Sequence, residues 1–230
     1  MHRQYPHFPS IITMKSTTFH TALLAALAAS SLHGEGLLPD NPFEDDVAFM
    51  KKHVDVIVLR DQNARVAVVP AYQGRVMTST TGGANAPSFG WVNRELISSG
   101  KVQPHINVFG GEDRFWIGPE GGQFSVFFSK GASFDLDHWF TPAPLDTEPF
   151  EVVSRKEDAA VFRRAFQLAN MSGTKFDVEV TRKVELLDSQ RVAGILGGDL
   201  PAAVKSVALE SANTLKNTGA AAWTKDSGLL

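Results

Sequence analysis

The chain has 230 residues, of which 43% are hydrophobic and 20% are charged, the composition of an ordinary globular protein. Its formal net charge is -3 and its lysines and arginines form no basic stripe along the sequence, so we expect no nucleic-acid partner. The absence of cysteine excludes disulfides, thiolate metal sites and a cysteine nucleophile.

The N-terminal region has the pattern of an export signal. Met14 and Lys15 open a short polar stretch, and residues 22–29 form an apolar run rich in Ala and Leu that small residues follow. The run is too short to span a bilayer, and the Gly- and Pro-containing residues 34–42 argue against a buried N-terminal helix. We therefore expect residues 1–33 to be upstream residues and a signal peptide starting at Met14. The mature chain is expected to be periplasmic or extracellular, with no membrane span.

A short helix is predicted next, within an N-terminal segment over residues 34–53. The acidic stretch at residues 41–52 predicts this helix, with Asn41 as its N-cap and Pro42 as its first helical residue. From residue 54 onward the pattern changes to strands.

The strand region begins with a predicted hairpin, in which the β-branched runs 54–59 and 65–69 flank turn residues 61–63. The clearest strand is residues 175–187, where apolar and polar residues alternate. Arg182 falls on its apolar face. Because a buried charge is costly, we expect the strand to leave the core there, the alternative being that Arg182 points into a polar pocket. Further strands are predicted at residues 123–128, 150–154, 160–168, 191–195 and 204–215.

Many short strands with little helix predict an antiparallel β-sandwich over residues 54–230. Residues 229–230 look like the first step of another apolar strand, and an edge ending in this way would leave backbone groups unpaired. We therefore expect the chain to be a fragment of a longer fold.

The established catalytic motifs are absent from the sequence. It has no phosphate-binding loop, no dinucleotide glycine fingerprint, no His-Glu-x-x-His and no Gly-x-Ser-x-Gly. The histidines that follow the predicted signal show no i,i+3 or i,i+4 spacing of the kind that holds a metal. We expect neither a metal site nor a cofactor, and the motifs assign no catalytic residue.

One dense polar segment, residues 103–123, remains as a candidate site. It places His, Asn, Arg and acidic side chains and a tryptophan among glycines and prolines, which suits a polyhydroxylated ligand. Residues 71–80 have similar chemistry, and Gly74 there would allow a bend or a close approach. The alternative, which composition alone slightly favours, is a structural corner with solvated charges. The candidate ligand-binding residues are Arg75, His105, Asn107, Glu112, Arg114, Trp116 and Glu120.

Four segments, in this order, resemble a bacterial family of galactose-mutarotase-like (aldose 1-epimerase-like) proteins. They are residues 72–75, residues 110–120 with the kernel Gly-Gly-x-x-x-x-Trp-x-x-Pro-Glu, residues 181–184, and residues 210–219 with Trp223. The resemblance runs from residue 54 to the end of the chain. It implies an all-β, galactose-mutarotase-like β-supersandwich whose concave face binds carbohydrate, with this chain as its N-terminal part.

The resemblance does not carry the epimerase chemistry over. In aldose epimerases a His acts as acid and a Glu from the C-terminal part of the fold acts as base, and the region around Asn213 has no His. The sequence therefore predicts an exported carbohydrate-binding protein. One alternative is an epimerase or other carbohydrate-active enzyme with His105 and Glu112 or Glu120 as proton-transfer groups. Another is a structural or assembly protein whose tryptophans form an interface.

Overall fold

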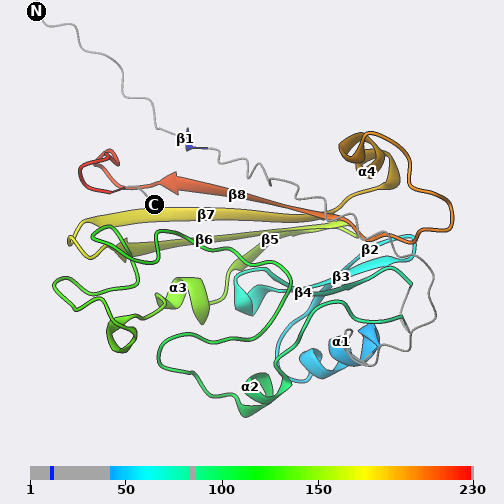
Figure 1. Cartoon of the computed structure of the whole chain (residues 1–230), viewed down its shortest axis with the longest axis horizontal. Coiled ribbons are helices and arrows are strands. Elements are labelled where there is room, and N and C mark those ends of the chain that lie inside the picture. Colours follow the sequence, from blue (N-terminus) through cyan, green and yellow to red (C-terminus); the bar gives the residue numbers. More distant parts are fainter. Residues whose placement is uncertain (1–10, 13–41, 83–85, 229–230) are drawn as a thin grey trace, which may run out of the picture.

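The structure is a computed structural model that describes residues 11–12, 42–82 and 86–228 of the chain. Within these residues the strands form two antiparallel sheets (Figure 1). The larger sheet has the order β1-β8-β7-β6-β5, and its strands are β1 (Ile11–Ile12), β8 (Leu209–Asn217), β7 (Lys175–Leu186), β6 (Ala159–Ala169) and β5 (Glu151–Arg155). The smaller sheet consists of β2 (Ile57–Asp61), β3 (Ala64–Val69) and β4 (Arg75–Thr80). The all-β architecture expected from the sequence is confirmed.

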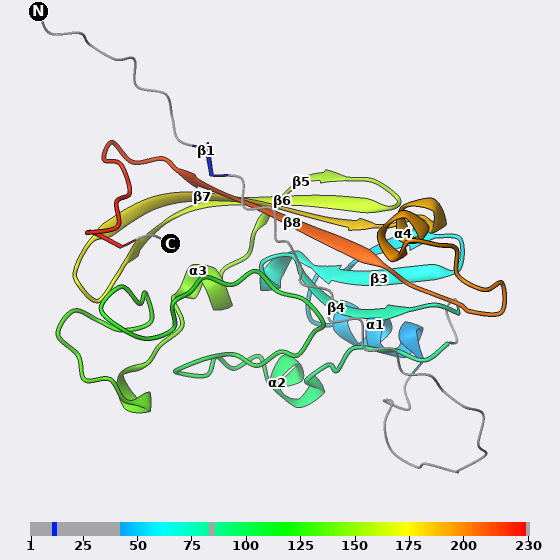
Figure 2. The same ribbon diagram turned by 45° about the horizontal axis from the view of Figure 1, so that its top comes forward.

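Short helices and one long connection complete the described part. The helices are α1 (Phe43–Lys51), α2 (Arg94–Ser99), α3 (Ala143–Asp146) and α4 (Ser189–Leu196), with single turns η1 (Pro70–Tyr72) and η2 (Leu136–His138). The smaller sheet and the connection from β4 to β5 lie on the same side of the larger sheet, and α1 covers the far face of the smaller sheet (Figures 1 and 2). No described helix is both long and apolar enough to cross a membrane.

The hydrophobic core has two parts, one on each face of the smaller sheet. On β3, Val66 and Val68 pack toward the larger sheet, where they join Phe162. The intervening Ala67 and Val69 join the cluster formed with α1. Because successive residues of a strand point to opposite faces, β3 is buried on both sides, which explains its continuous apolar sequence.

Most predicted strands are confirmed. β2 and β3 form the expected hairpin, with Gln62 in its turn at a φ of 48°. The strands predicted at residues 150–154, 160–168 and 175–187 correspond to β5, β6 and β7. The run at residues 204–215 becomes strand only from Leu209 onward, where β8 pairs with β7.

The strand predicted at residues 191–195 is wrong, because these residues lie in α4. The Asp188 side chain accepts a hydrogen bond from the backbone N–H of Arg191 at 2.8 Å, which caps the start of the helix. Gly197, with a φ of 77°, ends the helix in the left-handed conformation that glycine adopts without strain. These two caps outweigh the strand-like composition of the segment.

The strand predicted at residues 123–128 is also wrong. Val126, Phe127 and Phe128 are buried in loop structure, and Phe128 makes an isolated bridge with Trp139. The helix predicted near residue 42 begins at Phe43, and Pro42 is its N-cap residue, with extended backbone and no side-chain cap bond. The apolar run at residues 123–128 therefore reports burial of its last three residues but not strand pairing.

Some sequence expectations fall on residues that the structure does not describe. Residues 13–41 hold the predicted signal peptide and the predicted N-cap Asn41, and residues 229–230 hold the predicted start of a further strand. These expectations stay predictions.

Arg182 contradicts the expectation that β7 leaves the core, because its side chain is fully buried. Its Nε donates to the Gly74 carbonyl and its Nη1 to Asn213 Oδ1, each at 3.0 Å. Its Nη2 forms an ion pair with Asp113, whose second carboxylate oxygen accepts from Ser211. A carboxylate and two neutral acceptors therefore compensate the charge that a buried arginine carries.

Gly74 provides the close approach that the sequence predicted. It has a φ of 67°, and a Cβ atom there would lie 2.6 Å from the ring of Phe162 on β6. The preceding residue, Gln73, is also left-handed, with a φ of 62°. This bend aims the Gly74 carbonyl at Arg182, so β4 starts in direct contact with the larger sheet.

We expect Arg182→Met to lower the free energy of unfolding by about 3 kcal/mol, because it leaves Asp113 without its cation and two acceptors without a donor. Urea unfolding followed by circular dichroism measures the change. Lys183→Met is the matched control, because Lys183 is the next residue of β7, lies on the opposite face and is 42% exposed. We expect a loss below about 1 kcal/mol there. Equal losses in the two variants would contradict a central role for Arg182.

Candidate functional site

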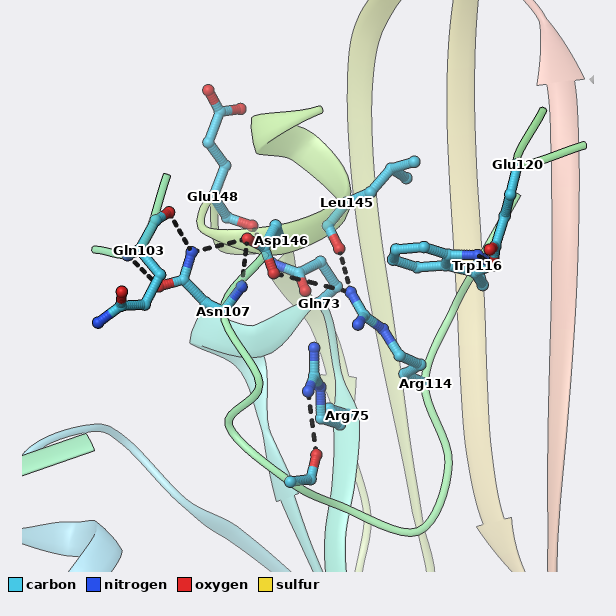
Figure 3. A network of polar contacts seen from close by, with 11 residues as sticks. Gln73, Arg75, Gln103, Asn107, Arg114, Trp116, Glu120, Leu145, Asp146 and Glu148 are labelled. Atoms are coloured by element: carbon cyan, nitrogen blue, oxygen red, sulfur yellow. Dashed lines mark hydrogen bonds and ion pairs between the residues drawn. The ribbon is translucent and has the colours of Figure 1, made fainter. Parts of the chain in front are cut away.

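Most of the predicted ligand-binding residues gather in one polar network between the start of β4, the connection that follows it, and α3 (Figure 3). The predicted residues that Figure 3 labels in this network are Arg75, Asn107, Arg114, Trp116 and Glu120. Arg75 is the first residue of β4, and the other four lie on the connection that runs from β4 to α3 on the same side of the larger sheet as β4 (Figure 1).

Asp146 lies at the centre of this network, and the sequence analysis missed it. It is the last residue of α3, and its side chain is 4% exposed, so its carboxylate is buried. Its Oδ2 accepts from the backbone N–H of Asn107 at 2.9 Å and from the Asn107 side-chain amide at 2.7 Å. Asp146 thereby fixes the start of the polar segment against α3.

Arg114 lies between Asp146 and the tryptophan. Its Nη2 donates to the Leu145 carbonyl at 2.7 Å and lies 3.8 Å from Asp146 Oδ1. Its guanidinium carbon is 4.1 Å from the ring centroid of Trp116, a distance typical of a cation–π contact. Burial lowers the pKa of Arg114, and the nearby Asp146 acts in the opposite direction.

Trp116 and Glu120 form the outer part of the network. The indole Nε1 donates to Glu120 Oε1 at 2.7 Å, and the Trp116 ring packs 5.0 Å from the ring of Phe127 in the core. Glu120 is exposed, Trp116 is half-buried, and the Arg114 side chain is 24% exposed. A cation, an indole and a carboxylate therefore meet the solvent together.

Arg75 lies beneath this outer part and is 2% exposed. Its Nη1 donates to the Gly110 carbonyl at 2.9 Å, and a Cβ atom at Gly111 would lie 2.9 Å from its Cδ. Burial lowers the pKa of Arg75 to about 10, and the positive charge of Arg114 acts in the same direction. Arg75 therefore supports the glycines of the kernel and does not reach the solvent.

Several buried polar atoms of the network have no hydrogen-bond partner among the described residues. They are Nε and Nη2 of Arg75, Nε of Arg114 and Oδ1 of Asp146. Buried donors and acceptors that lack a partner cost free energy, and native proteins retain few of them. Here an unpaired donor and an unpaired acceptor lie on the two members of one ion pair, Arg114 and Asp146.

Glu112 and His105 have other partners. Glu112 Oε1 accepts from the Ser79 backbone N–H at 2.6 Å and its Oε2 accepts from the Ser79 hydroxyl at 2.8 Å, so it ties the kernel to β4. Partial burial raises the pKa of Glu112, while the bonds from Ser79 act in the opposite direction. His105 Nδ1 lies 2.7 Å from the Trp139 carbonyl oxygen, and the His105 ring stacks on Phe140. The structure therefore ties the two residues to different parts of the chain, Glu112 to β4 and His105 to the segment that precedes α3.

Residues 41–230 match the model of a family described as a family of unknown function (DUF6786). The chain belongs to this family. The region matched to DUF6786 holds both sheets except β1, and it holds the whole polar network. Neither the curated proteins nor the solved structures contain a match to the chain.

Tyr72 is a further titratable group at the edge of the network. Its ring stacks on Phe109 with the centroids 3.9 Å apart, and it is 7% exposed. Burial raises the pKa of Tyr72 to about 12, although the charge of Arg75 acts in the opposite direction. Tyr72 therefore reports directly on how well water is excluded at the start of β4.

The chain has 2 tyrosines, so Tyr72 is the only one in a Tyr5→Phe variant. We expect its phenolate absorbance to rise with a midpoint at about pH 12 in the folded protein. In concentrated urea the midpoint should fall to about 10, the value of an exposed tyrosine. A midpoint near 10 while circular dichroism still shows folded protein would contradict the burial of Tyr72.

The direct titration of Tyr72 is preferable to measuring stability against pH, because Tyr72 and Arg75 change the free energy of unfolding in opposite directions. Between about pH 10 and 12 the unfolded state loses the Tyr72 proton before the folded state does, so Tyr72 makes stability fall as pH rises. Arg75 loses its proton earlier in the folded state, at a pKa of about 10, so it makes stability rise with pH in the same range.

Proposed function

We propose that this member of DUF6786 is an exported carbohydrate-binding protein whose ligand contacts Arg114, Trp116 and Glu120. The export part of the proposal rests on the signal-like pattern of residues 14–31. The binding part rests on the polar network and on the galactose-mutarotase-like resemblance of residues 110–120. The supersandwich that this resemblance implies belongs to the same proposal.

The observation that carries the proposal is the solvent-facing group formed by Arg114, Trp116 and Glu120. The Arg114 guanidinium carbon lies 4.1 Å from the Trp116 ring centroid, and the indole Nε1 donates to Glu120 Oε1 at 2.7 Å. A sugar hydroxyl both donates and accepts, so hydroxyl groups can bond to the Arg114 donors and to the Glu120 carboxylate. A simple anion would match Arg114 alone, and a simple cation would match Glu120 alone.

The outer residues supply the remaining chemistry of a sugar site. Trp116 offers an apolar surface of the kind that packs against the C–H face of a sugar ring, and the Glu120 carboxylate accepts hydrogen bonds from hydroxyls. Arg114 presents several N–H donors in a rigid planar fork. The three groups are chemically different and lie within one contact of each other, which allows them to orient a ligand.

The inner residues hold this arrangement in place before a ligand arrives. Asn107 fixes Asp146, Leu145 and Asp146 fix Arg114, and Arg75 supports the glycine turn that precedes Arg114. Preorganised side chains lose little conformational entropy when a ligand binds, which favours affinity. Arg75 and Asn107 are therefore proposed as positioning residues and not as direct ligand contacts.

Arg114→Lys is expected to weaken glycan binding by about tenfold, because lysine keeps the charge but loses the planar fork and its stacking on Trp116. Trp116→Ala should weaken binding at least as much. A glycan array on the purified protein identifies the ligand, and titration calorimetry with that glycan measures the change. Trp91→Ala is the control, since Trp91 is 56% exposed and lies outside the network.

A correctly folded parent protein that binds no glycan on the array would overturn the proposal. Equal weakening in Trp91→Ala and Trp116→Ala would also count against the proposed site. Circular dichroism of each variant separates loss of binding from loss of fold.

A further inference from the structure

A basic hollow lies at the junction of the two sheets, outside the polar network. Its volume is about 510 Å³, and it is lined by Lys51, Val56, Val58, Arg60, Arg155, Lys156 and Glu157. Lys51 ends α1, Arg60 lies on β2, and Arg155 and Lys156 lie at the turn between β5 and β6. The backbone N–H of Arg60 donates to the Glu157 carbonyl at 2.7 Å, so the two sheets meet at this point.

The cations of the basic hollow are not neutralised by neighbouring carboxylates. None of its lysines and arginines forms an ion pair with another described residue, and Glu157 is the one acidic residue in its lining. The chain as a whole has a net charge of -3, so four cations around one carboxylate are a local concentration of positive charge. Such a concave positive surface attracts anions.

A second observation points the same way. Arg60 lies directly opposite Arg65 in the register of the β2–β3 hairpin. Like charges facing each other across two strands destabilise the pair, and the Nε of Arg65 is buried without a hydrogen-bond partner among the described residues. An anion in the basic hollow would relieve this repulsion.

The lining limits what the anion can be. Arg60 and Arg155 present planar donors that match the oxygens of sulfate, phosphate or carboxylate groups. The half-buried Val58 adds some apolar surface, and the volume of about 510 Å³ exceeds that of a bare oxyanion. A nucleic-acid duplex would instead require phosphate contacts spread along a basic stripe.

We propose that the basic hollow binds an acidic group, sulfate or carboxylate, on a carbohydrate. The choice of a carbohydrate as the carrier of this group rests on the function proposed above. It adds a second contact region, formed by Lys51, Arg60, Arg155 and Lys156, that selects acidic glycans over neutral ones.

The test compares the binding of dextran sulfate and of uncharged dextran of equal length, measured by titration calorimetry. We expect the parent protein to bind dextran sulfate more tightly, with an affinity that falls as salt is added. Arg60→Glu combined with Arg155→Glu should weaken this binding by about tenfold or more. The first substitution also places a carboxylate opposite Arg65, which favours a retained fold.

Lys130→Glu combined with Lys175→Glu is the matched control, because it changes the net charge by the same amount. Lys175 pairs with Ala169 at one end of the β6–β7 ladder, whereas Arg155 pairs with Ala160 near the other end. If the Arg60 and Arg155 substitutions leave dextran sulfate binding unchanged, the proposed anion site in the basic hollow is wrong. It is also wrong if the control variant weakens this binding by the same factor. Equal or tighter binding of a DNA duplex at the same salt concentration overturns the choice of a carbohydrate.

The result also separates this inference from the proposed function. If Trp116→Ala abolishes neutral-glycan binding while the Arg60 and Arg155 substitutions have no effect on dextran sulfate, the polar network stands and the basic hollow fails. If the array shows no neutral glycan bound, but dextran sulfate binding depends on Arg60 and Arg155, the polar network fails and the basic hollow stands.

Discussion

The buried charge of Arg182 is the constraint on which the rest of the structure depends. An arginine with no exposed surface must keep its anionic partner, because leaving it unpaired costs about 3–5 kcal/mol. Its partner, Asp113, belongs to the connection between β4 and β5, and another of its acceptors is the Gly74 carbonyl. One side chain of the larger sheet therefore holds both the start of β4 and the kernel segment in place.

This constraint explains how the kernel can be both structural and exposed. Alongside β4 the kernel segment is extended, with Val76 and Asp113 joined by an isolated antiparallel bridge. Successive side chains in extended backbone point to opposite sides, so Asp113 and Phe115 turn toward the core. Arg114 and Trp116, which alternate with them, turn toward the polar network. The same short segment therefore anchors itself through one set of residues and presents the other.

Local patterns were sufficient to predict much of the fold. Alternation in β7 and the turn between β2 and β3 are short-range features, and both predictions are confirmed. The segment at residues 191–195 could also have been assigned correctly, because Asp188 and Gly197 are ordinary helix caps that are visible in the sequence. Residues 123–128 could not, since a short apolar run reports burial without saying whether a strand partner exists.

The candidate site was predictable only in part, for a different reason. Arg114, Trp116 and Glu120 are close in sequence, and a hydrogen bond and a ring contact join them in space. Asp146 lies 39 residues from Asn107, to which it is hydrogen-bonded, and its surroundings in sequence resemble an ordinary turn. A buried carboxylate of this kind is recognisable only when its partners are known, because nothing local distinguishes it from a solvated one.

The basic hollow shows the limit of inferring partners from net charge. A positive surface can be recognised in a sequence when its basic residues are contiguous. Here the cations come from α1, β2 and the β5–β6 turn, which are separate in the sequence and meet only in the fold. Charges interact strongly only within about 10 Å at moderate salt, so a ligand responds to the nearest side chains and hardly to the total of -3. The sequence argument against a duplex partner nevertheless keeps its force, because a duplex contacts an extended surface. The four cations of the basic hollow instead surround one small region, so a single acidic group can contact several of them at once.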